Sequence, residues 1–276
     1  MNILITGNEG FIGQNLSTYL VSKGHTVEGF EWKGDGIIPD PSTYDWVIHL
    51  GAISSTTETD VEKIMKQNYE FTMNLLQICD RMGVNIQLAS SASVYGPGLD
   101  GFKEESNCLP KSPYAWTKYL IDRWLKEAGV NDFNMLVQSF RYFNVYGPHE
   151  DHKGDQASPV HKFTQQAKDN KVIKLFENSD KYVRDFVCVS DVCRVHEEML
   201  TQDTSGIFNV GTGTTTSFKE VADVIANKWG AKVETIPMPE NLKGQYQEYT
   251  CADLTNLNKH CKINDYMTVK EYINAY

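Results

Sequence analysis

The 276-residue sequence predicts an α/β protein with a doubly wound parallel sheet and a smaller C-terminal lobe. A short apolar run, Asn2–Thr6, leads directly into a glycine-rich turn and then a helical pattern. Further apolar runs at 26–30, 45–50 and 84–88 alternate with helical segments. Small or polar residues follow several of these runs, at the strand ends where open parallel sheets bind ligands.

The composition excludes several classes of function. A net charge of −10 and a pI near 5.2 argue against general affinity for nucleic acid or anionic membranes. The longest apolar runs, such as 46–50, are too short to span a bilayer, and the first strand leaves no room for a signal peptide. The six cysteines form no C-x-x-C pair, which favours free thiols in a cytoplasmic protein. We expect no metal site.

The segment Gly7-Asn-Glu-Gly10-Phe-Ile-Gly13 lies between the first strand and the first helix. Gly7 would make a tight turn, Gly10 would let the backbone approach a pyrophosphate, and Gly13 would let the helix pack on the strand. The helix N-terminus would then face the phosphates. We therefore predict a Rossmann-type dinucleotide site, with Phe11 and Ile12 in contact with the cofactor.

The second strand is followed by residues that bear on the choice between NAD and NADP. Glu31 would accept hydrogen bonds from the adenosine ribose and favours NAD, whereas Lys33 could pair with a 2′-phosphate. One NAD or NADP per chain is expected, with Trp32 beside it. The residues from 31 to 45 are too few for a crossover helix and another strand. One strand–helix unit is therefore predicted to be missing after the second strand.

The third strand ends in a loop of small residues that we expect to touch the cofactor. The loop residues concerned are Leu50, Gly51, Ala52 and Ser54. A long helix over 58–82 carries Asn68, whose side chain would bond either the backbone of this loop or the nicotinamide ribose.

Ser91, Tyr114 and Lys118 form the candidate catalytic set. Tyr114 and Lys118 are one turn apart on a helix that begins near Ser112-Pro113. A phenol with a pKa of ~10 is a poor base at neutral pH. A lysine ammonium and an oxidised nicotinamide would favour its phenolate, while Ser91 would hydrogen-bond the same substrate hydroxyl. The set predicts proton transfer coupled to hydride transfer at an alcohol carbon.

These motifs, together with Tyr95-Gly96 and Arg141–Pro148, resemble the extended short-chain dehydrogenase/reductase superfamily in its NAD-dependent epimerase/dehydratase branch. The resemblance covers nearly the whole chain. Within the branch, it is nearest to the epimerases that act at C6, the exocyclic carbon of an ADP-glycero-manno-heptose. The more specific segments are 49–58, 146–154, 174–177, 184–186 and 242–257.

The resemblance implies that bound NAD(P)⁺ oxidises a sugar carbon transiently and that the hydride returns to the opposite face. It implies two acid/base residues on opposite sides of that carbon, Tyr114 and Lys153. Without the resemblance, Lys153 in its polar loop would be interpreted as a solvated lysine. To act as a base its amine must be neutral, which requires desolvation or a neighbouring cation.

The resemblance also implies a nucleotide-diphosphate sugar as the substrate and a homo-oligomer built through the helices at 58–82 and 113–129. Val145 would line the nicotinamide, and Arg184 would pair with the diphosphate. The other expected substrate contacts are Asn144, Asp155, Phe176, Glu177, Asn178, Ser179 and Tyr246.

We expect residues 1–150 to bind the dinucleotide, with returning segments near 183–212, and residues 151–276 to form mostly the substrate-binding lobe. A UDP-sugar 4-epimerase or another NDP-sugar epimerase or dehydratase is the nearest alternative. Asp155 and the residues around His161-Lys162 depart from the pattern of the branch, which bears on the choice of sugar. A dehydratase would need an acidic pair beside Ser91, where Ala92 and Ser93 stand instead. An alternative of another class is a non-catalytic NAD(P)-sensing protein, against which the retained tyrosine and lysine argue.

Overall fold

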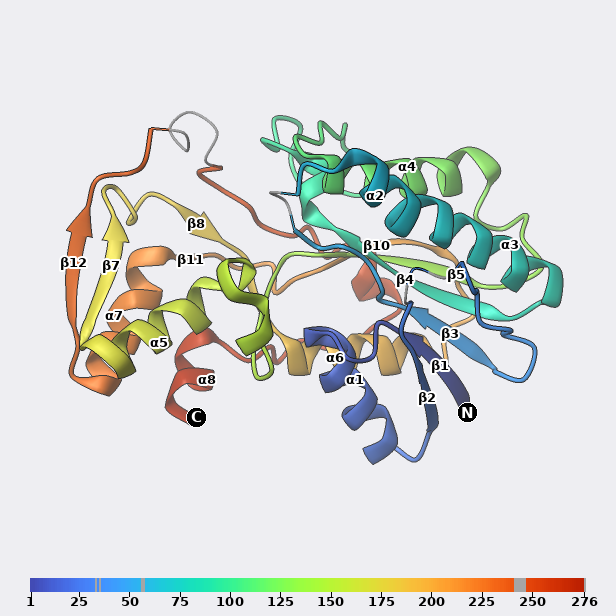
Figure 1. Cartoon of the computed structure of the whole chain (residues 1–276), viewed down its shortest axis with the longest axis horizontal. Helices are drawn as coiled ribbons and strands as arrows, with labels where there is room; N and C mark the ends of the chain where they lie inside the picture. Colours follow the sequence, from blue (N-terminus) through green and yellow to red (C-terminus); the bar gives the residue numbers. More distant parts are fainter. Residues whose placement is uncertain (33, 35, 56–57, 241–246, 276) are drawn as a thin grey trace.

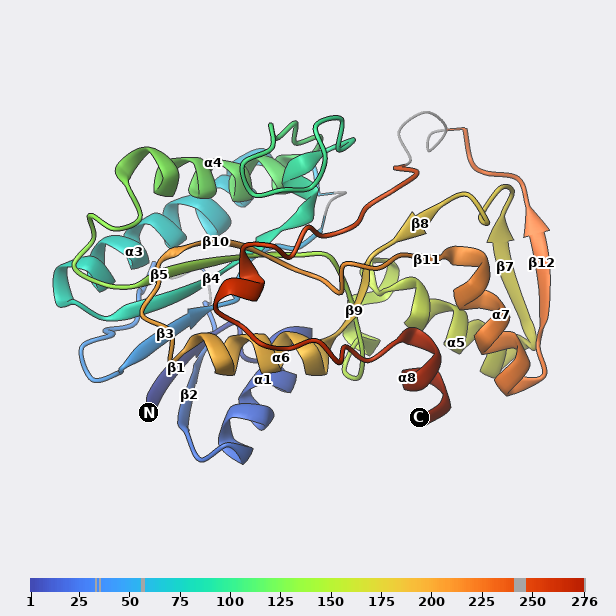
Figure 2. The ribbon, with the colours of Figure 1, turned by 180° about the vertical axis from the view of Figure 1, so that it is seen from behind.

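The central element is a six-stranded parallel sheet with helices on both faces, and a smaller lobe lies beside it (Figures 1 and 2). The computed structural model of the protein describes residues 1–32, 34, 36–55, 58–240 and 247–275. The strand order is β10-β5-β4-β3-β1-β2, and every neighbouring pair is parallel. The strands are β1 (Asn2–Thr6), β2 (Thr26–Phe30), β3 (Trp46–His49), β4 (Asn85–Ser91), β5 (Val137–Tyr142) and β10 (Gly206–Val210).

This order confirms the predicted doubly wound sheet. The chain moves outward from β1 to β2, then returns to β3 on the other side of β1, so the strand order reverses between β1 and β3. Open α/β sheets bind ligands outside the carboxyl ends of the strands at such a reversal. The fold therefore directs attention to the loops that follow β1 and β3.

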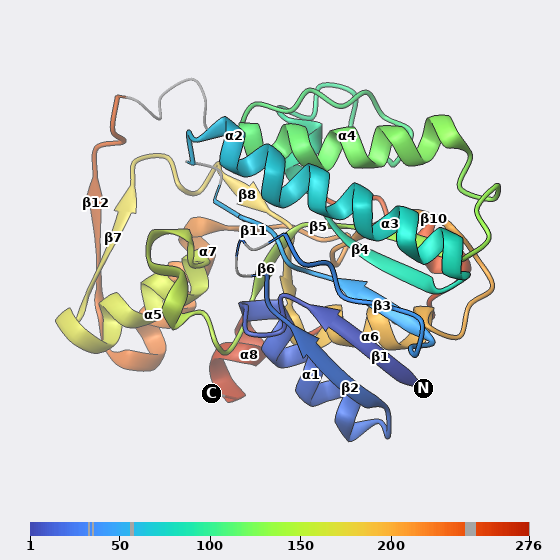
Figure 3. The ribbon, with the colours of Figure 1, turned by 45° about the vertical axis from the view of Figure 1, so that its right-hand side comes forward.

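Both faces of the sheet are covered by helices, as Figure 3 shows. On one face α1 (Phe11–Ser22) and α6 (Val189–Met199) pack against each other. On the other face lie α3 (Phe71–Met82) and α4 (Pro113–Ala128). All four residues of β3 and all six of β5 are buried, as expected for central strands of a parallel sheet that is covered on both faces.

β2 is the edge strand of the sheet, at the place where one strand–helix unit was predicted to be missing. Its residues are exposed or half-buried, unlike those of the central strands. Among the described residues between Glu31 and Asp45, no helix or strand occurs. In the described part of the chain, the sheet therefore ends at β2.

The helix predicted over 58–82 has a more complex form. It begins at α2 (Val61–Ile64), where Asp60 accepts a hydrogen bond from the Lys63 backbone at 3.0 Å. It continues through a π-helical turn, η1 (Met65–Glu70), into α3. Wider turns of this kind are frequent at functional sites. The periodicity of the sequence did not reveal this turn, because its residues have ordinary helix propensities.

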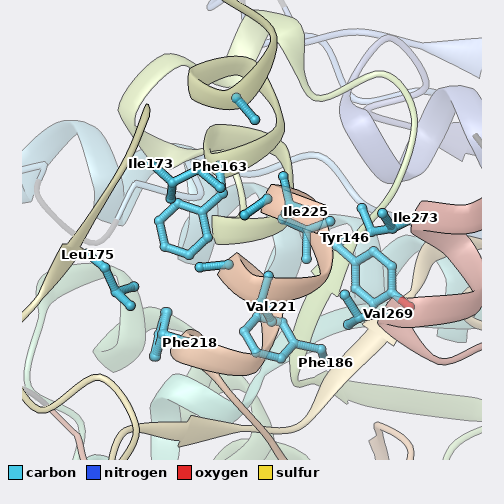
Figure 4. Close-up of a cluster of buried hydrophobic side chains, with 14 of the residues drawn as sticks. Tyr146, Phe163, Ile173, Leu175, Phe186, Phe218, Val221, Ile225, Val269 and Ile273 are labelled. Atoms are coloured by element: carbon cyan, nitrogen blue, oxygen red, sulfur yellow. The ribbon is translucent and has the colours of Figure 1, made fainter. Parts of the chain in front are cut away.

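The smaller lobe has its own apolar core. Its main elements are α5 (Pro159–Asn170), β7 (Val172–Phe176), α7 (Phe218–Trp229), β12 (Lys232–Ile236) and α8 (Val269–Ala275). Figure 4 shows Phe163, Leu175 and Phe218 packed together in this core. Short elements complete the fold: η2 (Ala92–Tyr95), β6 (Asn144–Tyr146), η3 (Asp151–Gln156), β8 (Val183–Arg184), β9 (Phe186–Cys188), β11 (Thr216–Ser217) and η4 (Leu257–Lys259).

Two later segments return from the lobe to the large sheet. The first runs through β9 and α6 to β10, which pairs with β5. The second is the tail, in which Leu257, Cys261 and Ile263 pack with Phe140 and Phe208. All six cysteines are free thiols, as the sequence predicted.

A buried ion pair connects α4 to the sheet. Arg141 Nε lies 2.7 Å from Asp122 Oδ2, and each side chain is only 1% exposed. Asp122 also accepts hydrogen bonds from Ser90 Oγ at 2.9 Å and Ser139 Oγ at 2.7 Å. Arg141 donates a further bond to the Tyr95 hydroxyl at 3.0 Å. Removing one partner of such a pair leaves a buried charge without compensation.

Replacing Asp122 with alanine should therefore lower the free energy of unfolding by about 3 to 5 kcal/mol. Urea titration followed by circular dichroism measures this loss. The matched control is Glu127→Ala in the same helix, which removes an exposed pair with Arg123 and should leave the free energy of unfolding almost unchanged. Equal losses in the two variants would contradict the role of Asp122 as the counter-charge of Arg141.

Candidate active site

The loops that follow β1 and β3 meet with almost no space between their backbones. Gly7 has φ +76°, and a Cβ there would lie 2.6 Å from the backbone nitrogen of Gly51. A Cβ on Gly13 would lie 2.1 Å from the Gly7 carbonyl oxygen. Only glycine therefore fits at 7 and 13, and both constraints come from backbone atoms that cannot move aside.

The N-terminus of α1 faces the same crevice. Gly10 caps this helix in an extended conformation, and in the described part of the chain no side chain bonds to the cap. The first backbone N–H groups of a helix have no intrahelical partner and favour anions. Phe11 and Gly13 are buried within this first turn, and Ile12 is half-buried. The arrangement fits a pyrophosphate.

Beside this turn lies a cavity of about 160 Å³. Its walls come from the ends of three strands and from the helix after β3, and the lining residues are Thr6, Gly7, Phe30, Glu31, Trp32, Gly51, Ala52, Ile53, Gln67 and Phe71. The Trp32 and Phe71 rings lie 6.1 Å apart. Glu31 accepts a hydrogen bond from the Glu9 backbone at 2.7 Å. A flat base and a ribose fit this mixture of rings, small residues and one carboxylate. Lys33, which could pair with a 2′-phosphate, lies outside the described residues.

Asn68, in the π-helical turn, has its side chain bound to the loop that follows β3. Its amide oxygen accepts from the Ile53 backbone N–H at 2.8 Å, and its amide nitrogen donates to the Ile53 carbonyl at 2.9 Å. The side chain is fully buried. Of the two roles considered for Asn68, the structure therefore gives it the bond to the loop backbone, which holds Gly51, Ala52 and Ser54 in place.

Ser91 and Tyr114 meet where β4 ends and α4 begins. Ser112 caps α4 through a bond from the Ala115 backbone at 3.2 Å, with Pro113 as the first helical residue. Burial raises the pKa of the Tyr114 phenol, and a hydrogen bond with the Ser91 side chain lowers it.

Lys118 lies fully buried one turn further along α4. Burial lowers its pKa to about 8, although the nearby Asp122 carboxylate opposes this shift. At neutral pH this ammonium still carries a proton. It is therefore available as a positive charge on the residue one helical turn from Tyr114.

His49 belongs to the same buried region and was not anticipated. Its ring bonds the Thr6 hydroxyl at 2.6 Å and the Thr72 hydroxyl at 2.8 Å. Burial lowers its pKa to about 3, and the Lys118 charge adds to the effect. The ring is therefore neutral and supports the ends of β1 and β3. A histidine inside an otherwise apolar strand was the signal available in the sequence.

Lys153 lies in the 3₁₀ turn η3 and reaches the dinucleotide crevice. Its Nζ is 4.9 Å from the centre of the Phe11 ring, in the glycine-rich turn. Burial lowers the pKa of the Lys153 amine, while Glu150 raises it. The side chain thus points toward the cofactor turn, which its polar sequence surroundings alone did not indicate.

The residues expected to hold the substrate lie mostly on the smaller lobe. Phe176 ends β7, and Ser179 folds back to donate to its carbonyl at 2.6 Å, while Asn178 takes φ +61° between them. Asn144 begins β6 and Val145 packs between two apolar clusters, at the junction with the sheet. Asp155 is exposed, Glu177 is exposed, and Tyr246 lies outside the described residues.

Arg184 is held by contacts within its own part of the chain. The residue is buried, and its guanidinium lies 5.3 Å from the centre of the Phe218 ring. It donates to the Val183 carbonyl at 2.9 Å and to the Gln247 carbonyl at 2.6 Å. These contacts hold the guanidinium at the start of the lobe.

The sequence pattern of one family, described as the NAD dependent epimerase/dehydratase family, matches residues 3–211. The chain belongs to this family. It is 37% identical to an ADP-L-glycero-D-manno-heptose-6-epimerase of Brachyspira hyodysenteriae, over 99% of this chain and 96% of that one.

Solved structures agree with this placement of the chain. The crystal structure of ADP-L-glycero-D-manno-heptose-6-epimerase from Helicobacter pylori superposes with a TM-score of 0.86 at 27% identity, over 100% of this chain and 94% of that one. A Thermus thermophilus UDP-glucose 4-epimerase in complex with NAD gives a TM-score of 0.81 at 26% identity, over 99% and 98%. The resemblance inferred from the motifs is therefore confirmed.

Two kinds of feature are absent from the residues that the structure describes. No group of three His, Cys, Asp or Glu side chains there is placed to hold a metal ion. No helix in that part of the chain combines the length and apolar character needed to cross a bilayer.

Gly10→Ala tests the pyrophosphate position in this family member. The backbone of Gly10 is extended, and an added Cβ would meet only the Gly7 carbonyl, at 3.3 Å. The variant should fold normally. Its affinity for NAD should fall at least about tenfold, which is about 1.4 kcal/mol of binding free energy, because a methyl group would occupy the space of the phosphates. Isothermal titration calorimetry measures the affinity and thermal unfolding the stability.

Gly13→Ala provides the contrast, because its Cβ would clash with backbone and should lower stability itself. Unchanged NAD affinity in a folded Gly10→Ala variant would place the pyrophosphate elsewhere.

Proposed function

We propose that this protein is a nucleotide-sugar epimerase that inverts the exocyclic C6 carbon of an ADP-glycero-manno-heptose, using bound NAD(P)⁺. The observation that carries the proposal is the placement of Lys153 beside Phe11, which brings a second ionisable group to the dinucleotide turn. The ADP-heptose 6-epimerases among the similar proteins support this choice of sugar. In this proposal residues 1–150, with 183–212, serve the dinucleotide, and residues 151–276 supply most sugar contacts.

Tyr114 is proposed as the acid/base on one face of the sugar carbon. When bound, NAD(P)⁺ would supply the hydride acceptor, and its reduced form would return the hydride to the opposite face of the keto sugar. Tyr114 accepts the hydroxyl proton, and Ser91 hydrogen-bonds the same oxygen and aligns it. The Lys118 ammonium favours the phenolate and holds the nicotinamide ribose.

Lys153 is proposed as the acid/base on the opposite face. Inversion requires a proton to be handled on both faces of the carbon, and one fixed phenol cannot easily reach both. Because burial lowers the pKa of Lys153, its neutral form becomes accessible at a lower pH than that of a solvated lysine. This supports its use as a base.

The lobe is proposed to hold the nucleotide diphosphate of the sugar. Arg184 would exchange its bond to the Gln247 carbonyl for phosphate oxygens, which suit a planar guanidinium. The turn formed by residues 176–179 would contact the nucleotide. Asn144, Asp155 and Tyr246 complete the proposed contacts, and Val145 would line the nicotinamide.

Tyr114→Phe and Lys153→Met should each lower C6 inversion of an ADP-heptose by a factor of about 10² to 10⁴, because each removes one proton-transfer group. NAD affinity should stay within about twofold, since both changes leave Gly10 and the backbone N–H groups at the start of α1 intact. Inversion is followed by NMR of the sugar and NAD binding by calorimetry. The matched control is Lys168→Met, an exposed lysine of α5, which should invert at the wild-type rate.

Three outcomes would revise the proposal. Near-wild-type turnover by Lys153→Met would remove the two-base assignment. Inversion of UDP-galactose but not of an ADP-heptose would favour the 4-epimerase alternative, to which the structural likeness to a UDP-glucose 4-epimerase also points. Tight NAD binding with turnover of neither sugar would favour the sensing protein.

We also propose that the protein is a cytoplasmic homo-oligomer. The free thiols fit a reducing compartment. Large apolar side chains are exposed on the helices expected to form the interface, namely Val61 on α2, Met82 on α3 and Trp116 on α4. Apolar groups of this size at a helical surface favour association.

Trp116→Asp should therefore shift the oligomer toward monomer, because it places a charge in an apolar contact. Light scattering after size-exclusion chromatography measures the mass. Leu99→Asp, at an exposed residue outside these helices, serves as the control. A wild-type protein that is monomeric at micromolar concentration would refute the proposed interface.

A further inference from the structure

We propose that Glu150 is a positioning residue, whose buried carboxylate fixes the loop that holds the Lys153 amine against the dinucleotide turn. The inference rests on the proposed function in one respect: Lys153 is taken as the second acid/base. It adds a residue outside the reacting set, on which the geometry of that base depends.

The carboxylate of Glu150 joins the two ends of the loop. Its Oε1 accepts from the Gly147 backbone N–H at 3.1 Å and from the Ser158 hydroxyl at 2.8 Å. Its Oε2 accepts from the Ser158 backbone N–H at 2.6 Å. The residue is only 1% exposed, so these three bonds replace its hydration. One side chain thus closes the segment from Gly147 to Ser158.

The chain between these ends is short and tightly turned. The Lys153 backbone N–H donates to the Glu150 carbonyl at 2.9 Å, and the Ala157 N–H donates to the Gly154 carbonyl at 3.1 Å. Gly154 has φ +50° and ψ −124°, a conformation that favours glycine. Because few residues lie between Gly147 and Ser158, the bonds from Glu150 to these two residues also determine the direction of the Lys153 side chain.

A second contact fastens this loop to the dinucleotide helix. The Asn15 side-chain amide in α1 donates to the Phe11 carbonyl at 2.8 Å and to the Pro148 carbonyl at 2.9 Å. The ring of Phe11 is the surface against which the Lys153 amine rests. Figure 1 shows the segment before α5 beside α1. The loop from Gly147 to Ser158 therefore keeps a fixed position relative to the glycine-rich turn that would bind the pyrophosphate.

The three donors at this position require a carboxylate. A glutamine would present an NH₂ group to one of them, leaving a buried N–H without an acceptor. An aspartate is one methylene shorter and would not reach both ends of the loop. If Glu150 only stabilised the fold, its removal would impair proton transfer by Tyr114 and by Lys153 alike. If Glu150 positions Lys153, its removal should impair proton transfer by Lys153 alone.

Glu150→Ala should lower C6 inversion by about tenfold or more, since a displacement of about 1 Å can cost 10²-fold. Oxidation of the epimer whose hydroxyl faces Tyr114 should keep its wild-type rate, measured by stopped-flow absorbance of the reduced nicotinamide. Oxidation of the other epimer should fall with inversion. Glu150→Gln should recover part of the loss, because its amide oxygen still accepts. Asp151→Ala, an exposed carboxylate of the same loop, should behave as wild type.

A second measurement needs no sugar. Competitive labelling of the lysines with acetic anhydride, read by mass spectrometry across a pH series, gives the limiting rate for each amine. In the wild type Lys153 should react several-fold more slowly than the exposed Lys66, because it rests on Phe11. In Glu150→Ala and Glu150→Gln the Lys153 rate should rise toward that of Lys66, while Asp151→Ala leaves it unchanged.

The outcomes separate this inference from the proposed function. If the wild type inverts no ADP-heptose, the proposed function fails, and the labelling still decides whether Glu150 positions Lys153. Unchanged labelling of Lys153 in the Glu150 variants overturns the inference even where the sugar is inverted. Equal loss of oxidation for both epimers, together with a lower melting temperature, also overturns it, because that result indicates general destabilisation.

Discussion

The site depends on one close approach between two strand ends. Because Gly7 and Gly51 touch backbone to backbone, the loops after β1 and β3 form one continuous wall at the point where the strand order reverses. The α1 N-terminus, the cavity beside the glycine turn and the loop bound by Asn68 all lie around this contact. A side chain at Gly7 would separate the loops and remove the wall.

Burial then sets the protonation of the groups gathered there. It keeps His49 neutral, lowers the lysine pKa of Lys118 and Lys153, and raises that of the Tyr114 phenol, which the Ser91 hydrogen bond counteracts. These shifts have a common cause, the loss of water around each charge. Asp122 lies in the same buried region. Its carboxylate is paired with Arg141 and also raises the pKa of Lys118. Stability and chemistry share one buried region.

The two proposed acid/base residues are held by different means. Tyr114 stands on a long, capped helix packed on the sheet, so its position follows from regular structure. Lys153 stands on a short turn between the sheet and the lobe, where regular structure ends, and its position requires the Glu150 carboxylate and the Asn15 amide. A loop of this kind allows substrate contacts to vary without moving the sheet.

The sequence by itself determined the parallel sheet, the missing unit after β2, the glycine turn and the placement of Tyr114 and Lys118 one turn apart on a helix. Each of these depends on residues close together in the chain, so its pattern is visible locally. Only the tertiary structure decided the direction of Lys153, the bond from Asn68 to the loop, the neutral His49 and the closure by Glu150. Most of these contacts join different elements of the fold, and even the short-range bonds of Glu150 depend on how its loop folds back. Local sequence patterns do not encode distances between segments that meet only when the chain has folded.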